Sequence, residues 1–180
     1  YKQTIIGILW ALFQPFATMV VFTIFFGKFG KIPSDNIPYP VFVFSGLLLW
    51  HLFSASLLQA SNSLVSQQNL ITKVYFPRLV IPLSAVLAGV VDFAIAFIVL
   101  VALMIFYGIV PTAAIITLPF FILLAVATAL AVGLWLSALN VEYRDVRYAM
   151  PFFIQLWMYA SPIVYPLELV PKGLRFWVAL

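Results

Sequence analysis

Cysteine is absent from the 180 residues, and charged side chains make up only 8% of them. Without cysteine there is no disulfide framework, no thiolate metal site and no thiol nucleophile. His51 is the single histidine, so no pair of imidazoles can hold a metal. No GxxxxGK[ST] loop occurs to bind ATP phosphates, and no Ser-His-Asp arrangement or pair of catalytic carboxylates appears. We therefore predict a chain that is not an enzyme and holds no metal or cofactor.

Apolar residues, in contrast, make up 66% of the chain, against roughly 45–50% in soluble domains. Too few polar residues remain to cover such a chain in water, so the excess apolar surface must face lipid. The net charge is +4, but the nine Lys and Arg residues are scattered and form no nucleic-acid-binding patch. The composition predicts a membrane protein with no nucleic-acid partner.

Five apolar runs match the length of transmembrane helices, which need about 20 residues to cross the hydrocarbon core. The runs are continuous and lack the period-two alternation of membrane strands, so we predict an all-α, polytopic helical bundle. The predicted spans are Ile5–Phe26, Val41–Ser66, Leu79–Tyr107, Ala114–Leu139 and Met150–Tyr165. The fifth is short and bounded by Pro151 and Pro162. A sixth run begins at Phe176, and we expect the chain to be a fragment of a longer protein.

The connectors between these spans are short, and Gln67–Arg78 and Asn140–Ala149 carry most of their charge. Alternating spans place five of the nine basic residues on one side of the membrane: Lys2, Lys73, Arg78, Arg144 and Arg147. The other side carries the remaining four: Lys28, Lys31, Lys172 and Arg175. Basic residues are enriched in cytoplasmic loops, so we expect the first side to be cytoplasmic.

Asp92, near the middle of the third predicted span, is the sole acidic residue inside a span. A carboxylate there costs roughly 2.5–3.5 kcal/mol or more and is a functional hypothesis by default. Two interpretations remain open. Asp92 belongs to a transport pathway, or it is a protonated or hydrogen-bonded carboxyl that holds helices together.

Polar residues recur along the second predicted span at spacings near multiples of 3.6, namely His51, Gln59, Asn62 and Ser66. Such a face avoids lipid and meets either a neighbouring helix or a wet cavity. Gln59 and Asn62 are therefore candidates for a translocation pathway, together with Asp92.

Aromatic residues make up 17% of the chain. Interfacial anchoring or packing explains most of them. The alternative is that some line a path for sugars, whose C–H faces pack on aromatic rings. The candidates on the first and fifth predicted spans are Trp10, Phe13, Phe16, Trp157 and Tyr159.

Three stretches carry a family resemblance: YKQTIIGILWALFQPF, NLITKVYFPRLVIPL and NVEYRDVRYAMPFFIQLWMYASPIVYP. They resemble the permease subunits of bacterial ABC exporters of polysaccharides, the family that handles O-antigens, capsules and teichoic acids. The stretches occur in order, with matching spacing, and cover nearly the whole chain.

The resemblance implies that residues 1–180 are a single transmembrane permease domain with six spans in the full protein. Five are complete here, the sixth is incomplete, and an amphipathic helix is missing before Tyr1. It further implies cytoplasmic termini, a bacterial inner-membrane location, and a homodimer that pairs with two ATP-binding cassette subunits. ATP and Mg would be bound by those subunits. The segment after Pro162 would form short re-entrant helices on the outer face.

In such a family the two charged connectors touch the ATPase. The coupling residues implied are Asn69, Lys73, Tyr75, Phe76, Arg78, Glu142, Arg144, Asp145 and Arg147. Pro77 disfavours helix at the residue before it, which favours a short rigid element with an aromatic side chain beside it. The alternative is that Lys73 and Arg78 only contact anionic membrane lipid.

The function we expect is the pathway subunit of an ATP-driven exporter of a polysaccharide or lipid-linked glycan. A permease that exports a drug or a lipid is the first alternative, since related exporters share the architecture. An integral membrane glycosyltransferase-type enzyme is the second, and the missing paired acids and metal cluster count against it. A secondary transporter is disfavoured by the lone intramembrane acid and by the lack of a detected internal repeat.

Overall fold

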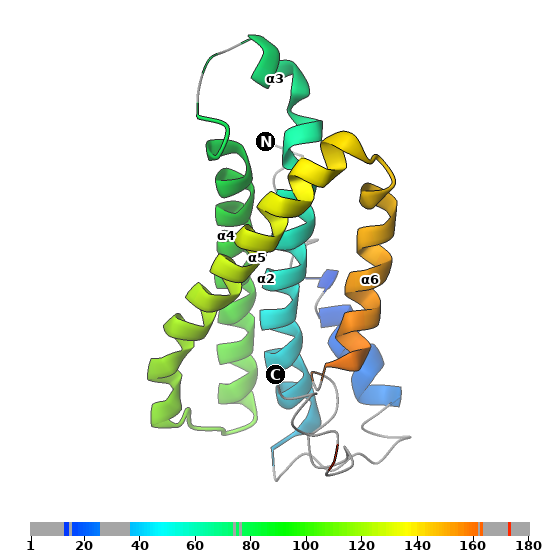
Figure 1. Ribbon diagram of the computed structural model, residues 1–180. Helices are drawn as coiled ribbons and strands as arrows, with labels where there is room; N and C mark the ends of the chain where they lie inside the picture. Colours follow the sequence, from blue (N-terminus) through cyan, green and yellow to red (C-terminus); the bar gives the residue numbers. More distant parts are fainter. Residues whose placement is uncertain are drawn as a thin grey trace. The chain divides into compact units, whose positions relative to one another are not determined.

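The computed structural model describes residues 13–14, 16–25, 37–73, 75, 77–161, 163 and 173. These residues form helices, turns and irregular segments, with no strand among them (Figure 1). The all-α fold class is therefore confirmed for the described part of the chain. The start of the first predicted span and the run from Phe176 lie outside it.

Three helical stretches are long and apolar enough to cross a membrane: Tyr39–Ser66, Val80–Phe106 and Ile115–Glu142. The first two are α2 and α4, and their ends lie close to the predicted ones. The third combines part of a 3₁₀ turn, η2 (Ala113–Thr117), with α5 (Leu118–Glu142). A shorter apolar helix, Phe16–Phe25, lies within the first predicted span. The predicted six-span count goes beyond what these helices establish.

Helix α6 (Val146–Ala160) departs most from the prediction of Met150–Tyr165. It begins four residues earlier, so Pro151 lies inside the helix instead of bounding it. Pro151 has no N–H to donate, so the helix lacks the backbone bond to the carbonyl of Arg147. At 15 residues, α6 is roughly 22 Å long, which is short of the ~30 Å hydrocarbon core.

The two charged connectors are also more helical than predicted. Gln67–Arg78 contains a six-residue helix, α3 (Gln68–Lys73). The connector predicted over Asn140–Ala149 shrinks to residues 143–145, because α5 runs on to Glu142 and α6 begins at Val146. Its charged side chains are therefore presented from helix ends as well as from a loop.

The chain divides into two compact units. The first comprises the described parts of Tyr1–Trp50, Asp92–Thr112 and Leu156–Leu180, and the second comprises those of His51–Val91 and Ala113–Gln155.

The core of the first unit forms where the N-terminal helix, the start of α2 and the end of α6 meet. Its buried residues are Phe22, Tyr39, Val43 and Leu47, and Phe42, Met158 and Ile163 pack against them. Gly46 permits this packing, because a Cβ atom there would lie 2.8 Å from the carbonyl oxygen of Ile163. The backbone around Ile163 thus approaches α2 more closely than any side chain would allow.

In the second unit, small residues bring α4 and α5 onto α2. A Cβ atom at Gly89 of α4 would lie 3.0 Å from Ser56 Oγ, and one at Gly133 of α5 would lie 2.6 Å from Ala60 Cβ. Ser56 and Ala60 are both fully buried on α2. Helices in membranes associate through such close contacts between small residues, since lipid supplies no hydrophobic drive between them.

Replacing Gly133 by valine should therefore destabilise the full-length protein, because the new Cβ collides with the short, rigid Ala60 side chain. We expect a loss of about 1–3 kcal/mol, the usual cost of overpacking, measured as a lower thermal unfolding temperature in detergent. Ala131→Val, at an exposed position of the same helix, is the matched control and should change little. Equal unfolding temperatures for the two variants would contradict the close packing of α5 on α2.

Candidate functional site

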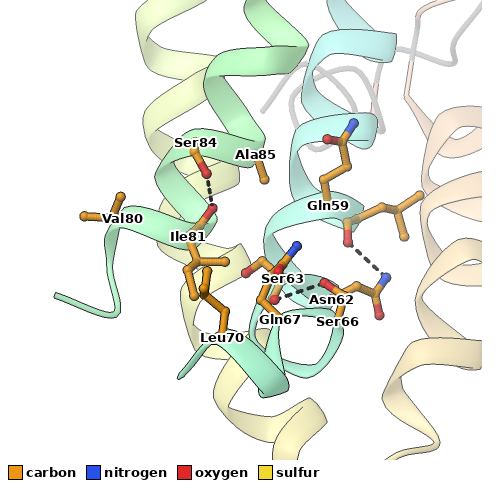
Figure 2. A pocket seen from close by; sticks show the side chains of 11 residues that line it. Gln59, Asn62, Ser63, Ser66, Gln67, Leu70, Val80, Ile81, Ser84 and Ala85 are labelled. Atoms are coloured by element: carbon orange, nitrogen blue, oxygen red, sulfur yellow. Dashed lines mark hydrogen bonds between the residues drawn. The ribbon is translucent and has the colours of Figure 1, made fainter. Parts of the chain in front are cut away.

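The second unit contains a cavity beside the C-terminal end of α2, which we call the polar groove. Its volume is about 620 Å³. Its lining residues come from α2, α3, α4 and the turn at Gln67, and they are Leu58, Gln59, Asn62, Ser63, Ser66, Gln67, Leu70, Val80, Ile81, Ser84 and Ala85. Figure 2 shows these side chains around the groove.

The hydroxyl groups of the groove are satisfied within their own helices. Ser63 donates to the carbonyl of Ala60 at 2.6 Å, Ser66 to that of Ser63 at 3.0 Å, and Ser84 to that of Ile81 at 2.8 Å. Such bonds let serine occupy a membrane helix without an unpaired donor. The Gln59 side chain, in contrast, is exposed to the surroundings of the chain. An exposed amide on a membrane span calls for water, a ligand or another protein surface, because lipid offers it no hydrogen bond.

A second cavity, which we call the arginine pocket, lies on another side of α2 and α3. Its volume is about 590 Å³. The residues that line it are Leu64, Val65, Gln68, Ile71, Thr72, Arg78, Asn140, Val141, Arg144, Arg147 and Tyr148. Three guanidinium groups thus meet at one pocket, from the connector before α4, the loop after α5 and the first turn of α6. No acidic residue is among the lining residues.

A hydrogen bond between two amides connects the walls of these cavities. Asn140, which lines the arginine pocket, donates from Nδ2 to Asn62 Oδ1 at 3.0 Å and to the carbonyl of Ser61 at 3.2 Å. Asn62, which lines the polar groove, donates its own Nδ2 to the carbonyl of Leu58 at 3.0 Å. Because Asn140 is only 2% exposed, this pair fixes α5 against α2 inside the unit.

The structure unites two of the predicted pathway residues. Gln59 and Asn62 both line the polar groove, as does Ser66 from the same predicted stripe, whereas His51 does not. The stripe on α2 therefore meets a cavity and, through Asn62, a neighbouring helix.

The other predicted pathway residues belong to the first unit or lie outside the described residues. Asp92 is exposed and sits near the middle of α4. Phe13 and Phe16 are exposed near the N-terminal end of the described chain, and Trp157 and Tyr159 are about half exposed on α6. The ring of Trp157 meets that of Trp50 edge-on at a centroid distance of 6.2 Å. Trp10 lies outside the described residues.

The predicted coupling residues separate into two groups. Arg78, Arg144 and Arg147 line the arginine pocket. The others do not line it. Asn69 and Lys73 are exposed on α3, Tyr75 is fully exposed, Glu142 and Asp145 are exposed beside the short loop, and Phe76 lies outside the described residues.

Sequence reasoning missed Asn140, Gln68, Thr72 and Tyr148 as site residues. For Asn140 a signal was present. The buried residues of α5 are Ala129, Gly133, Leu136, Ser137 and Asn140. Their spacing of three and four marks one helix face, on which small and polar residues replace large apolar ones. No sequence pattern indicates Thr72 and Tyr148 as site residues, because their positions at the pocket depend on how the connectors fold.

The whole chain, residues 1–180, matches the family described as ABC-2 type transporter, and the protein therefore belongs to that family. Together with the apolar helices, this membership makes it a membrane-integral protein.

Three relatives align with most of this chain. The chain is 32% identical to the O-antigen export system permease protein RfbA of Myxococcus xanthus, over 94% of the chain and 65% of that protein. It is 28% and 27% identical to two proteins of the same name from Klebsiella pneumoniae, over 96% of the chain and 66% of each. The chain thus spans slightly less than two thirds of the length of these relatives.

Replacing Asn140 by alanine should destabilise the contact between α5 and α2. Both hydrogen bonds from its amide would be lost, and Asn62 Oδ1 would lose its donor. Hydrogen bonds between membrane helices contribute ~0.6–2 kcal/mol each, so we expect a loss of about 1–2 kcal/mol in unfolding free energy. Asn69→Ala, at an exposed amide on α3, is the control. An Asn140→Ala protein as stable as that control would show that the pair contributes nothing.

Proposed function

We propose that this protein is the membrane-spanning permease subunit of an ATP-driven exporter that moves a polysaccharide or lipid-linked glycan across the bacterial inner membrane. The observation that carries the proposal is the similarity to O-antigen export permeases over 94–96% of the chain. The match to the ABC-2 type transporter family over residues 1–180 supports the same class.

In this proposal the chain provides the pathway and performs no chemistry. ATP and Mg are bound by a separate ATP-binding cassette subunit, and the permease pairs with a second copy of itself. The full protein has six spans, and the ends of α2 and α5 with their connectors face the cytoplasm. The distribution of basic residues supports that orientation, since cytoplasmic connectors carry an excess of Lys and Arg.

The polar groove is the part of the described chain that best suits a sugar-bearing substrate. It offers the exposed Gln59 amide and the oxygens of Asn62 and three serines, within helices that are otherwise apolar. Amides and hydroxyls can donate hydrogen bonds to sugar hydroxyls and accept hydrogen bonds from them.

Coupling to the ATPase is assigned in this proposal to the exposed connector residues around Tyr75. Its side chain is 103% exposed, so no contact within the described chain explains an aromatic ring at this position. Tyrosine is enriched among the residues that dominate protein interfaces. Asn69, Lys73, Glu142 and Asp145 are exposed on the same two connectors and are proposed as polar contacts of the ATPase. Phe76 is a second candidate for an aromatic contact with it.

The test is to express the full-length permease and its ATPase in a bacterium whose own polysaccharide exporter is deleted. We expect surface polysaccharide to return, with drug susceptibility unchanged. Tyr75→Ala should weaken association with the ATPase by about 2 kcal/mol, or roughly 30-fold, and polysaccharide should accumulate inside the cell. Co-purification and a surface-polysaccharide immunoassay measure the two effects.

Tyr107→Ala, at an exposed tyrosine just beyond the other end of α4, is the matched control and should leave both readouts intact. Changed drug susceptibility without restored surface polysaccharide would replace the glycan by a drug as substrate. Full ATPase association and export in Tyr75→Ala would remove Tyr75 from the coupling interface.

A further inference from the structure

The arginine pocket carries concentrated positive charge that its own lining residues do not neutralise. Arg78, Arg144 and Arg147 line it together, and no Asp or Glu of the described residues does. The nearest acids along the chain, Glu142 and Asp145, are exposed and lie outside the lining. Three like charges at one cavity repel each other, so the arrangement favours an anionic ligand.

The hydrogen-bonding groups of the pocket fit a phosphate. A guanidinium group binds phosphate oxygens through two parallel N–H bonds, which an ammonium group cannot do. Gln68 and Tyr148 add neutral amide and hydroxyl donors from α3 and α6, whereas the Thr72 hydroxyl donates within α3. A lipid phosphodiester offers two charged oxygens and two weaker ester oxygens to these groups, whereas a carboxylate offers two oxygens in all.

The pocket also has an apolar side, formed by Leu64, Val65, Ile71 and Val141. Leu64, Val65 and Val141 belong to the last turns of the spans α2 and α5. The polar members Gln68, Thr72, Arg78 and Arg144 follow directly after those spans or precede α4. The lining thus changes from apolar to cationic where the spans end, the same change that a phospholipid makes from its acyl chains to its phosphate.

We propose that the arginine pocket binds the phosphate group of a membrane lipid headgroup, with the lipid's upper acyl carbons on its apolar side. Free phosphate in the cytosol would bind the arginines in the same way, but it would make no favourable contact with the apolar residues. A volume of about 590 Å³ lies within the 300–1,000 Å³ range of small-ligand sites and accommodates a headgroup with its glycerol. The proposal does not depend on the exported substrate.

The test titrates the purified full-length permease, without its ATPase, with short-chain dioctanoyl phosphatidylglycerol. Dioctanoylglycerol, which lacks the phosphate, and inorganic phosphate are the comparison ligands. A basic residue near an anionic lipid surface contributes an amount equivalent to about a fivefold change in affinity. We therefore expect Arg78→Gln, Arg144→Gln and Arg147→Gln each to weaken phosphatidylglycerol binding about fivefold, and the triple variant to weaken it more than 50-fold.

Lys73→Gln is the matched control, because Lys73 is an exposed cation on α3 that does not line the pocket. It should change the affinity less than twofold. Arg→Lys at the same three positions should retain more affinity than Arg→Gln, since lysine keeps the positive charge. It should not reach the wild-type affinity, since lysine lacks the planar guanidinium group. The three arginines are exposed, so the unfolding temperature of each variant should stay that of the wild-type protein.

Three results would overturn the proposal. Equal losses of phosphatidylglycerol affinity in Lys73→Gln and the arginine variants would mean that the lipid binds to general surface charge and not in the pocket. Inorganic phosphate binding as tightly as phosphatidylglycerol would assign the pocket to a soluble phosphate. Unchanged lipid affinity in the triple variant, with lost association with the ATPase, would assign the arginines to protein docking, and that outcome leaves the proposed export function standing.

Discussion

Hydrocarbon offers no hydrogen bonds, and this constraint governs every polar atom that the spans of this protein carry. Backbone groups meet it by forming helices, which is why the described residues contain no strand. Serine hydroxyls on α2 meet it by donating to carbonyls three residues earlier, as Ser61 does to Leu58 at 2.9 Å. The Asn140 amide meets it by crossing to α2. Among the described residues, Thr23 Oγ1 and Ser56 Oγ are buried without a hydrogen-bond partner, and the exposed Gln59 amide lies at the groove.

Helix α2 separates two cavities of different chemistry in the second unit. Small residues on α2 let α4 and α5 approach it closely, so that most of its length there is sealed by packing. Near its C-terminal end the neighbouring helices leave room, and the polar groove and the arginine pocket open on different sides of it. The bond between Asn62 and Asn140 joins the walls of the two cavities.

The sequence predicted the apolar helices well, because a continuous run of about 20 apolar residues has few folded alternatives in a membrane. The predicted helix ends were less accurate where a proline or a charged residue was taken as the boundary of a helix. Pro151 lies inside α6, since a proline near a helix start removes a single bond. Residues 140–142, which end at the charged Glu142, continue α5, since near a membrane surface a helix end can be polar.

The candidate site was only partly predictable for a related reason. Gln59 and Asn62 share one helix face, and helical periodicity found them. The arginine pocket joins Arg78 to Arg144 and Arg147 across more than 60 positions of sequence, and no periodicity reports such a contact. Asn140 was partly predictable. The spacing of small residues on α5 indicates which helix face carries Asn140, but it does not indicate which residue that side chain contacts.

The exposed Gln59 amide at the polar groove on α2 requires surroundings other than lipid, because lipid offers it no hydrogen bond. Because the chain contains no cysteine, single cysteines placed in the full-length protein report directly on their surroundings. We predict that a hydrophilic thiol reagent labels Gln59→Cys at least about tenfold faster than Leu87→Cys, an exposed apolar position of α4, because thiolate forms readily only in water. Equal, slow labelling at both positions would show that lipid covers the groove and would contradict the account.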